Sequence, residues 1–243
     1  MNFKIQLKKI FAFLGLQIVF MPHRGVDLNQ DIKYYLPNLS MDLIFDVGAN
    51  IGQSVNSYRA WFPKAKVHCF EPGRDTFEQL KSNTKSDDSI QCHNIALGAS
   101  NRTGDLVINK DLSVMNFLAN ESDLKENIDG DMDRQKITVE TLDSFCQSNN
   151  IAEISYLKID TEGSDLEVLK GANSMLTKKK ISIVEVETGM NPGNSYHVPF
   201  ECVKSYLESA GYFLFGIYEQ VYEWQLNQPQ LRRANSVFIA KAP

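Results

Sequence analysis

Apolar, β-rich runs alternate with amphipathic segments through most of this chain, and this alternation limits its possible folds more than any other feature. Such a rhythm is typical of βαβ units, in which helices cover a mostly parallel sheet. The 243 residues suit one sizeable α/β domain with helices on both faces of the sheet. Strands are expected at about Leu43–Val47, Lys66–Phe70, Ile90–Ala96, Leu106–Asn109, Ile137–Glu140, Ser155–Ile159, Ile181–Val186, Tyr212–Tyr218 and Ser236–Ala240, and helices at about Gln53–Trp61, Asp75–Ser82, Asp165–Leu176 and Phe200–Ala210.

The charge and the cysteines exclude several classes of protein. A formal net charge of -5 provides no positive field for a phosphate backbone, so nucleic acid is not an expected partner. The four cysteines, Cys69, Cys92, Cys146 and Cys202, lie far apart and form no CxxC pair, which excludes metal-finger spacing. Cys69 and Cys92 lie in apolar runs and are predicted to be buried thiols. These features predict a cytoplasmic protein.

The N-terminal segment combines basic and apolar residues. Lys4, Lys8 and Lys9 precede the apolar run Ile10–Met21, which resembles the start of a signal peptide. The run is shorter than the about 20 residues that a membrane-spanning helix needs, and no A-x-A-like cleavage site follows it. We therefore predict that residues 1–40 form a helical extension packed on a domain at 41–243, with no spanning segment. Peripheral membrane contact is the alternative.

Two segments depart from the parallel pattern. The run IALGASNRTGDLVIN, residues 95–109, has a turn-rich middle between strand-like residues, so an antiparallel excursion from the sheet is expected there. Residues 111–134 are polar and contain Asp-Gly-Asp at 129–131. We expect a loop there that covers a ligand.

The segment FDVGANIG, residues 45–52, forms the first strand-to-helix turn of the domain. In open α/β sheets this turn approaches the ligand most closely. Gly48 permits a positive φ and a close backbone approach, and Gly52 lets the helix pack on its strand. Asn50 gives the spacing G-x-N-x-G rather than the G-x-G-x-x-G of the dinucleotide fingerprint, which disfavours a pyrophosphate cradle. Any tight strand-to-helix connection could also use such a turn.

Glu71 ends the second strand, in the run VHCFEP. An acid about 20 residues beyond the glycine turn is placed to accept hydrogen bonds from both ribose hydroxyls. The alternative is a carboxylate that interacts with the dipole of the helix after Pro72. The turn and the acid together favour a ribose-bearing cofactor, and NAD, FAD and S-adenosylmethionine all fit this spacing.

Several segments together resemble the FkbM family of S-adenosylmethionine-dependent methyltransferases: FDVGANIG, HCFEP, NIALG, LKIDTEGSDLEVLKGA, IVEVE and LRRANSVFIA. The resemblance runs from about residue 43 to the C-terminus. It implies a Rossmann-like class I methyltransferase sheet with the last strand inserted antiparallel. It also implies S-adenosylmethionine as the cofactor and a small-molecule or glycan acceptor, usually methylated on an oxygen of a sugar.

The same resemblance assigns the cofactor site residue by residue. The positions that match are Asp46, Gly48, Asn50 and Gly52 in the first motif, Glu71 as the ribose ligand, and Asn94 and Ala96 near the adenine. One departure is His93, since such methyltransferases often place an acid near the adenine edge and none stands at 93–97. Adenine recognition by backbone groups is therefore expected.

The segment LKIDTEGSDLEVLKGA places polar residues at the end of a buried strand. Lys158, Asp160 and Glu162 are unusual choices in a parallel strand, which is apolar on both faces, so Asp160 and Glu162 are interpreted as functional. Ser164 and Glu167 have the spacing of a capping box, and both are assigned to the stability of the following helix.

The next strand carries Glu185 and Glu187, which share one face because they are two residues apart. With Asp160 on the neighbouring strand, three carboxylates are expected to converge and would repel one another if fully ionised. Mg²⁺ or Mn²⁺ bound by Asp160, Glu185 and Glu187 could relieve the repulsion and lower the pKa of a sugar diol. The exposure of one glutamate would relieve it equally well.

Methyl transfer to a hydroxyl requires a base that takes the acceptor's proton. The candidates are His197, in the loop NPGNSYHVPF, then Asp160 and Glu187. An imidazole suits the task, although a surface-loop histidine with no role is the alternative. Arg232 and Arg233 could bind a phosphate or carboxylate of the acceptor, or be a solvated pair of charges.

Two other functions fit parts of the sequence. A binding or regulatory module could keep the methyltransferase fold without its chemistry, and exposed, unorganised carboxylates would indicate it. A nicotinamide-dependent oxidoreductase would need the third glycine of the dinucleotide pattern, which is missing.

Overall fold

The computed structural model describes residues 3–15, 24–108, 117–118, 133–194, 196–223 and 229–240. The chain divides into two compact units, Met1–Asn38 and Leu39–Pro243. The first unit contains α1 (Phe3–Phe13) and α2 (Leu28–Tyr35). None of the helices in the described ranges is long and apolar enough to cross a bilayer. The packing of this extension on the domain stays a prediction.

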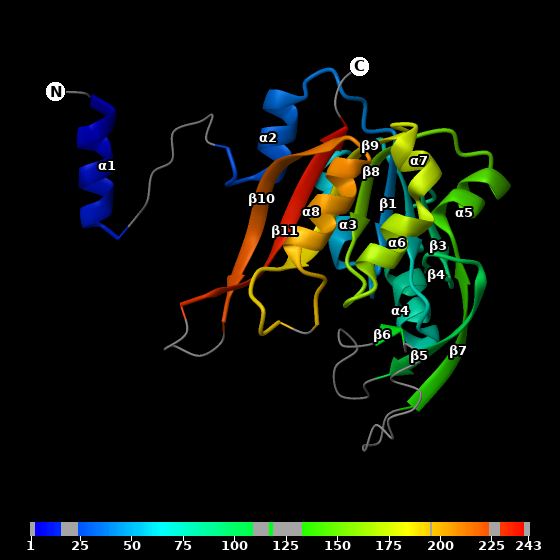
Figure 1. Cartoon of the computed structure of the whole chain (residues 1–243). Coiled ribbons are helices and arrows are strands. Elements are labelled where there is room, and N and C mark those ends of the chain that lie inside the picture. The colour runs from blue at the N-terminus through cyan, green and yellow to red at the C-terminus, as the bar shows by residue number, and fades with distance from the viewer. Residues whose placement is uncertain are drawn as a thin grey trace. The chain divides into compact units, whose positions relative to one another are not determined.

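The second unit is built on a seven-stranded sheet (Figure 1). Five neighbouring strands, β9, β8, β1, β2 and β3, pair in parallel. The strand β11 is inserted antiparallel between β9 and β10. This arrangement confirms the predicted α/β sheet, mostly parallel with an antiparallel last strand. In order across the sheet, the strands are β10 (Tyr212–Tyr222), β11 (Leu231–Ala240), β9 (Ile181–Gly189), β8 (Ile154–Ile159), β1 (Leu43–Val47), β2 (Lys66–Phe70) and β3 (Ile90–His93).

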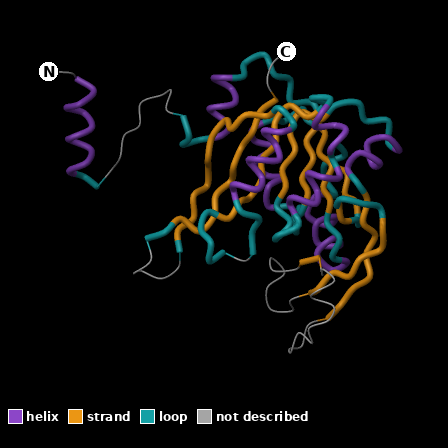
Figure 2. Tube along the Cα trace, viewed as in Figure 1, coloured by secondary structure: helices purple, strands orange, loops and turns teal. Residues whose placement is uncertain are grey.

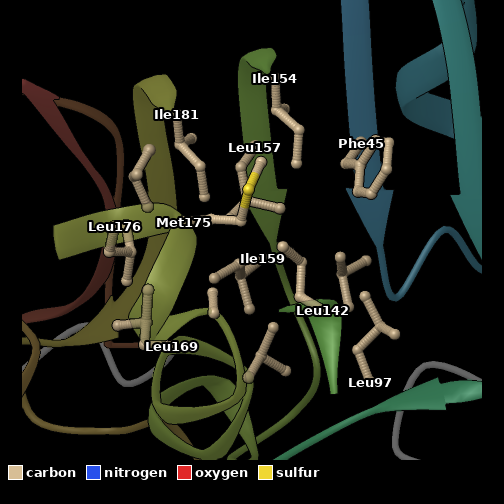
Figure 3. Packing of buried hydrophobic residues seen from close by; sticks show 14 of the residues in the cluster. Phe45, Leu97, Leu142, Ile154, Leu157, Ile159, Leu169, Met175, Leu176 and Ile181 are labelled. Carbon is tan, nitrogen blue, oxygen red and sulfur yellow. The ribbon is translucent and has the colours of Figure 1, made fainter. Parts of the chain in front are cut away.

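One face of this sheet carries the larger part of the hydrophobic core (Figure 3). Side chains alternate along a strand, so Phe45 and Leu157, which are register partners on β1 and β8, point to this face together. Apolar side chains from four helices cover them and exclude water. These helices are α5 (Leu142–Ser148), α6 (Asp165–Gly171), α7 (Asn173–Thr177) and α8 (Phe200–Ser209).

The opposite face carries α3 (Gln53–Trp61) and α4 (Arg74–Thr84). Tyr58 of α3 lies edge-on to Tyr156 of β8, and its hydroxyl donates to Oδ1 of Asp46 at 3.3 Å. Helices therefore cover both faces, as predicted; Figure 2 traces their alternation with the strands. On this face Asp46, Lys158 and Glu185 are register partners on three neighbouring strands. This row of ionisable groups forms the base of the candidate site.

A separate four-stranded sheet corrects one prediction and agrees with another. The run 90–96 does not form one strand, because β3 ends at His93 and β4 (Ala96–Leu97) pairs in parallel with β7 (Asp133–Glu140). The predicted excursion at 95–109 contains β5 (Arg102–Ile108), whose antiparallel partner is β7. β6 (Phe117–Leu118) lies within the predicted loop at 111–134, and the rest of that loop up to residue 132 lies outside the described residues.

The structure also adds one helix and corrects two local expectations. The helix α5 was not predicted, although Thr141 caps it by accepting a hydrogen bond from the backbone N–H of Ser144. Ser164 precedes α6 but makes no capping hydrogen bond, and Glu167 instead forms an exposed ion pair with Lys170. The thiol of Cys92 is only half-buried, because β3 is the edge strand of the sheet.

Candidate active site

A cavity of about 680 Å³ lies at the carboxyl ends of the parallel strands. It is the position at which an α/β sheet of this kind binds its ligand. The predicted site residues that line it are Gly48, Asn50, Glu71, Ala96, Asp160, Glu185, Glu187 and His197. Asp46, Gly52 and Asn94 are not among the residues that line it.

The glycine turn after β1 has a left-handed backbone at three positions. The φ angles are 84° at Gly48, 48° at Asn50 and 92° at Gly52. A Cβ at Gly48 would overlap the carbonyl oxygen of Asp160, so this turn and the end of β8 can meet only if residue 48 is glycine. At Gly52 a Cβ would lie 3.0 Å from the side chain of Leu80 on α4. The predicted positive φ at Gly48 is therefore confirmed, whereas the close contact at Gly52 is with α4 and not with the preceding strand.

Glu71 connects the glycine turn to the turn after β2. Its Oε2 accepts a hydrogen bond from the backbone N–H of Asn50 at 3.1 Å, and its Oε1 accepts one from Gly73 at 2.8 Å. Burial raises the pKa of this carboxyl to about 7, against the opposing effect of these two hydrogen bonds. A carboxylate has about four acceptor positions, so the side chain keeps capacity for further donors from a ligand.

Asp46 and Asn94 stand behind the cavity wall. Asp46 is fully buried, and burial raises the pKa of its carboxyl to about 6, while the ammonium of Lys158 lowers it. The side-chain amide of Asn94 donates to the backbone oxygens of Glu71 at 2.9 Å and Pro72 at 3.0 Å. Asn94 therefore orders the turn that carries Glu71, and Ala96 forms part of the cavity lining itself.

The polar row beneath the cavity is internally paired. Lys158 Nζ donates to Asp160 Oδ2 at 2.7 Å. Burial opposes the charged form of Lys158, but the nearby carboxylates of Asp160, Asp46 and Glu185 raise its pKa above the ordinary value. Oxygens of Glu185 accept hydrogen bonds from the hydroxyl of Tyr156 and the amide of Asn235. Burial raises the pKa of Glu185 as well.

A second group of polar side chains also lines the cavity. Nε2 of His197 is 2.7 Å from Oε2 of Glu187 and 3.9 Å from Oε2 of Glu162, and Arg233 pairs with Oε1 of Glu187. One ligand atom from each of Glu162, Glu187 and His197 lies within 4.8 Å of the others. The structure therefore does not gather the predicted metal ligands Asp160, Glu185 and Glu187, because Asp160 and Glu185 are held by their own partners.

The orientation of His197 is set by Asn194. Oδ1 of Asn194 lies 3.0 Å from Nδ1 of the imidazole and also accepts the backbone N–H groups of Tyr196 and His197, while its Nδ2 donates to the carbonyl of Arg232. Nδ1 must therefore donate. Since the residue is only 8% exposed, the surface-histidine alternative is wrong. Both ring nitrogens of His197 therefore face oxygens, Nδ1 that of Asn194 and Nε2 that of Glu187.

The turn after β8 holds Glu162 against the cavity in a left-handed conformation. Its φ is 49°, and that of Gly163 is 99°. Oδ1 of the buried Asp165 accepts hydrogen bonds from the backbone N–H of Thr161 at 3.0 Å and from its hydroxyl at 3.2 Å, which stabilises this turn. A left-handed backbone at a residue other than glycine is typical of functional sites. The sequence pointed to Glu162 as functional, but its proximity to His197 was not predicted.

Residues 46–214 match the family model of the methyltransferase FkbM domain. The chain belongs to the FkbM family of methyltransferases. Relatives of this FkbM-family protein include a hexuronic acid methyltransferase, AglP, of Haloferax volcanii, which is 30% identical over 153 residues, 62% of this chain and 58% of AglP. Another is a 2-O-methyltransferase, NoeI, of Sinorhizobium fredii, 26% identical over 160 residues, 59% of this chain and 62% of NoeI. The match thus spans less than two thirds of each relative.

Two solved structures illustrate the wider likeness. The precorrin-6y C5,15-methyltransferase of Geobacter metallireducens is 8% identical, with a TM-score of 0.46 over 92% of this chain and 94% of that one. The complex of LepI with SAM is 11% identical, with a TM-score of 0.46 over 92% of this chain and 50% of that one.

Proposed function

We propose that this chain transfers the methyl group of S-adenosylmethionine to a hydroxyl of a sugar, glycan or glycosylated small molecule. The observation that carries the proposal is a cavity that joins the glycine turn and Glu71 to Asp160, Glu187 and His197. The family supports methyl transfer, and the relatives named as a hexuronic acid methyltransferase and a 2-O-methyltransferase support a sugar hydroxyl as the acceptor.

The methyl donor binds at the glycine turn. Glu71 accepts hydrogen bonds from the two ribose hydroxyls, and the left-handed backbone at Gly48 and Asn50 lets the donor approach the sheet closely. Ala96 lies beside the adenine. Asp46, Gly52 and Asn94 contribute indirectly, because they shape the turns that carry these groups.

Asp160 takes the proton of the acceptor hydroxyl. Its Oδ2 is held by Lys158, which leaves Oδ1 for the acceptor, and its backbone lies against Gly48, so the base is adjacent to the donor turn. The hydroxyl oxygen bonds to the methyl carbon while the carbon–sulfur bond breaks and its electron pair stays on sulfur. The products are S-adenosylhomocysteine, the methyl ether and a protonated Asp160.

Glu187 and His197 orient the acceptor rather than accept its proton. His197 donates to Asn194 through one nitrogen and contacts Glu187 through the other, and Arg233 pairs with Glu187. These contacts fix the side chains in one geometry, which favours the binding of hydroxyl groups in one orientation.

Two measurements test the proposal. Thermal shift with S-adenosylhomocysteine, S-adenosylmethionine and NAD should show stabilisation by the first two, and stabilisation by NAD alone would contradict it. Methyl-labelled S-adenosylmethionine is then incubated with sugars, nucleotide sugars and glycolipids, and mass spectrometry locates the methyl ether. Tight donor binding with no label transferred to any acceptor would favour a binding module without chemistry.

A further inference from the structure

We propose that Glu162, Glu187 and His197 form a binding site for a divalent transition-metal ion, for which Mn²⁺ is the probe. The three residues come from the turn after β8, from β9 and from the loop before α8. This ligand set shares only Glu187 with the trio predicted from the sequence. The binding of the ion does not depend on the proposed function, but its use in holding the acceptor rests on that function.

The distances suit one ion. Nε2 of His197 is 2.7 Å from Oε2 of Glu187 and 3.9 Å from Oε2 of Glu162, and all three ligand atoms lie within 4.8 Å of one another. Imidazole nitrogens and carboxylate oxygens bind such ions at about 2.0–2.2 Å, so ligand atoms of one ion lie about 3–4 Å apart. Small rotations of the side chains therefore complete the coordination.

The imidazole is presented in the form that a metal requires. Because Nδ1 donates to the fixed oxygen of Asn194, the neutral tautomer of His197 carries its proton there and directs the lone pair of Nε2 at the two carboxylates. Histidine ligands of metals almost always donate their other nitrogen to such an acceptor. A lone pair that faces two carboxylates needs a cation between them.

The carboxylates are also arranged as ligands. Oε1 of Glu187 is engaged by Arg233, which orients Oε2 toward the cluster. Within the described part of the chain, the carboxylate of Glu162 accepts no hydrogen bond, and its Oε2 lies 3.9 Å from Nε2 of His197. The left-handed backbone at Glu162, supported by Asp165, holds this group at the cavity although no hydrogen bond fixes its side chain.

The ligand set selects the class of ion. One imidazole nitrogen and two carboxylate oxygens suit Mn²⁺, Fe²⁺ or Zn²⁺, whereas Mg²⁺ and Ca²⁺ prefer oxygen ligands alone. All three residues line the cavity, so the remaining coordination positions face its interior. Two neighbouring hydroxyls of a sugar could occupy them, which would lower the pKa of the hydroxyl to be methylated.

The experiment uses the full chain after treatment with a chelator. Mn²⁺ is added, and the free ion is followed by electron paramagnetic resonance, with Zn²⁺ and Mg²⁺ as competitors. We expect one Mn²⁺ per chain, displaced by Zn²⁺ far more readily than by Mg²⁺. His197→Gln and Glu162→Gln should each weaken binding strongly. Asn194→Ala keeps all three ligands and should weaken binding by about 10–100-fold.

The matched control is Glu167→Gln, which removes a nearby exposed carboxylate that pairs with Lys170, and its affinity for Mn²⁺ should equal that of the unchanged chain. Circular dichroism checks the fold of every variant. No saturable binding of Mn²⁺ or Zn²⁺, or binding that survives His197→Gln and Glu162→Gln, would overturn the proposal. S-adenosylhomocysteine is titrated into the metal-free chain in parallel. Failure of that titration would count against the proposed function and not against the metal site.

Discussion

The donor end and the acceptor end that we propose for the cavity are built in different ways. At the donor end, backbone N–H groups of Asn50 and Gly73 meet one carboxylate, that of Glu71, and all three lie on short turns directly after β1 and β2. At the acceptor end, the groups in contact are side chains, which come from segments far apart in the chain. The comparison teaches that the backbone determines the donor site, whereas side-chain pairing determines the acceptor site.

The strongest test of this difference is Asp160→Asn. The substitution removes the proposed base and leaves the donor turn unchanged, so turnover should fall by about 10²–10⁴-fold while the affinity for S-adenosylhomocysteine stays the same. Methyl transfer and calorimetry measure the two effects. Asp105→Asn is the matched control, because it breaks another Asp–Lys contact of 2.7 Å, with Lys136. Near-normal turnover in Asp160→Asn would clear Asp160 of any part as the base.

Glu71→Ala tests the donor end, because this substitution should weaken the binding of the donor itself. Two charge-assisted hydrogen bonds to the ribose, each worth about 1.5–3 kcal/mol, predict that donor affinity falls by at least about 10²-fold. Calorimetry with S-adenosylhomocysteine measures the loss, and a thermal melt checks the fold. Glu78→Ala removes an exposed glutamate of α4 and should leave the affinity unchanged. A variant at residue 71 that binds the donor normally would remove the ribose assignment.

Gly48→Ala tests the backbone contact where the two ends meet. The left-handed φ alone costs about 1–3 kcal/mol for a residue with a Cβ, and the overlap with the carbonyl of Asp160 adds to it. Gly211→Ala is the matched control, since φ there is 77° and the new Cβ meets only the flexible end of Lys179. Urea denaturation should show a larger loss in the free energy of unfolding for Gly48→Ala. Equal losses would mean that the backbone approach at Asp160 is not tight.

The pH dependence of donor binding is the smallest expected effect. Burial raises the pKa of Glu71 to about 7, so the carboxylate of the free protein becomes protonated as the pH falls through that value. Only the ionised form accepts both ribose hydroxyls, hence donor affinity should decrease by up to about tenfold for each pH unit below this pKa. Titration of S-adenosylhomocysteine across this range measures the effect, and Glu71→Gln should abolish the pH dependence. If the affinity of the unchanged chain for S-adenosylhomocysteine stays constant across this pH range, the result would contradict this role of Glu71.

The parts of the fold that were predicted well are those with strong local patterns. The bounds of β1, β2 and α3 agree with the expected Leu43–Val47, Lys66–Phe70 and Gln53–Trp61, because each is a short periodic run between clear turn residues. The left-handed φ at Gly48 follows from the same local chemistry. The pairing of β7 with β4 and β5 was not predicted, since strands separated by a long segment leave no local trace of their partner.

For the candidate site as well, the sequence predicted individual residues but not the contacts between them. The sequence pointed to Glu71, Asp160, Glu187 and His197, and the structure places them all on one cavity. Their pairing was not foreseen: Lys158 holds Asp160, and Asn194 occupies the nitrogen of His197 that faces away from Glu187. Such contacts depend on how three separate segments meet in space, and residue spacing carries no information about that.

By itself, the sequence determined the α/β sheet, the glycine turn and its carboxylate, because these depend on hydrophobic periodicity and on the backbone freedom of glycine. Only the tertiary structure decided which acidic residues meet one another. It separated Asp160 and Glu185 from Glu187, and it brought Glu162 to His197. The physical reason is that a charged group in a buried wall must find its partners across the fold, and the packing of β8, β9, β11 and the loop before α8 sets those partners.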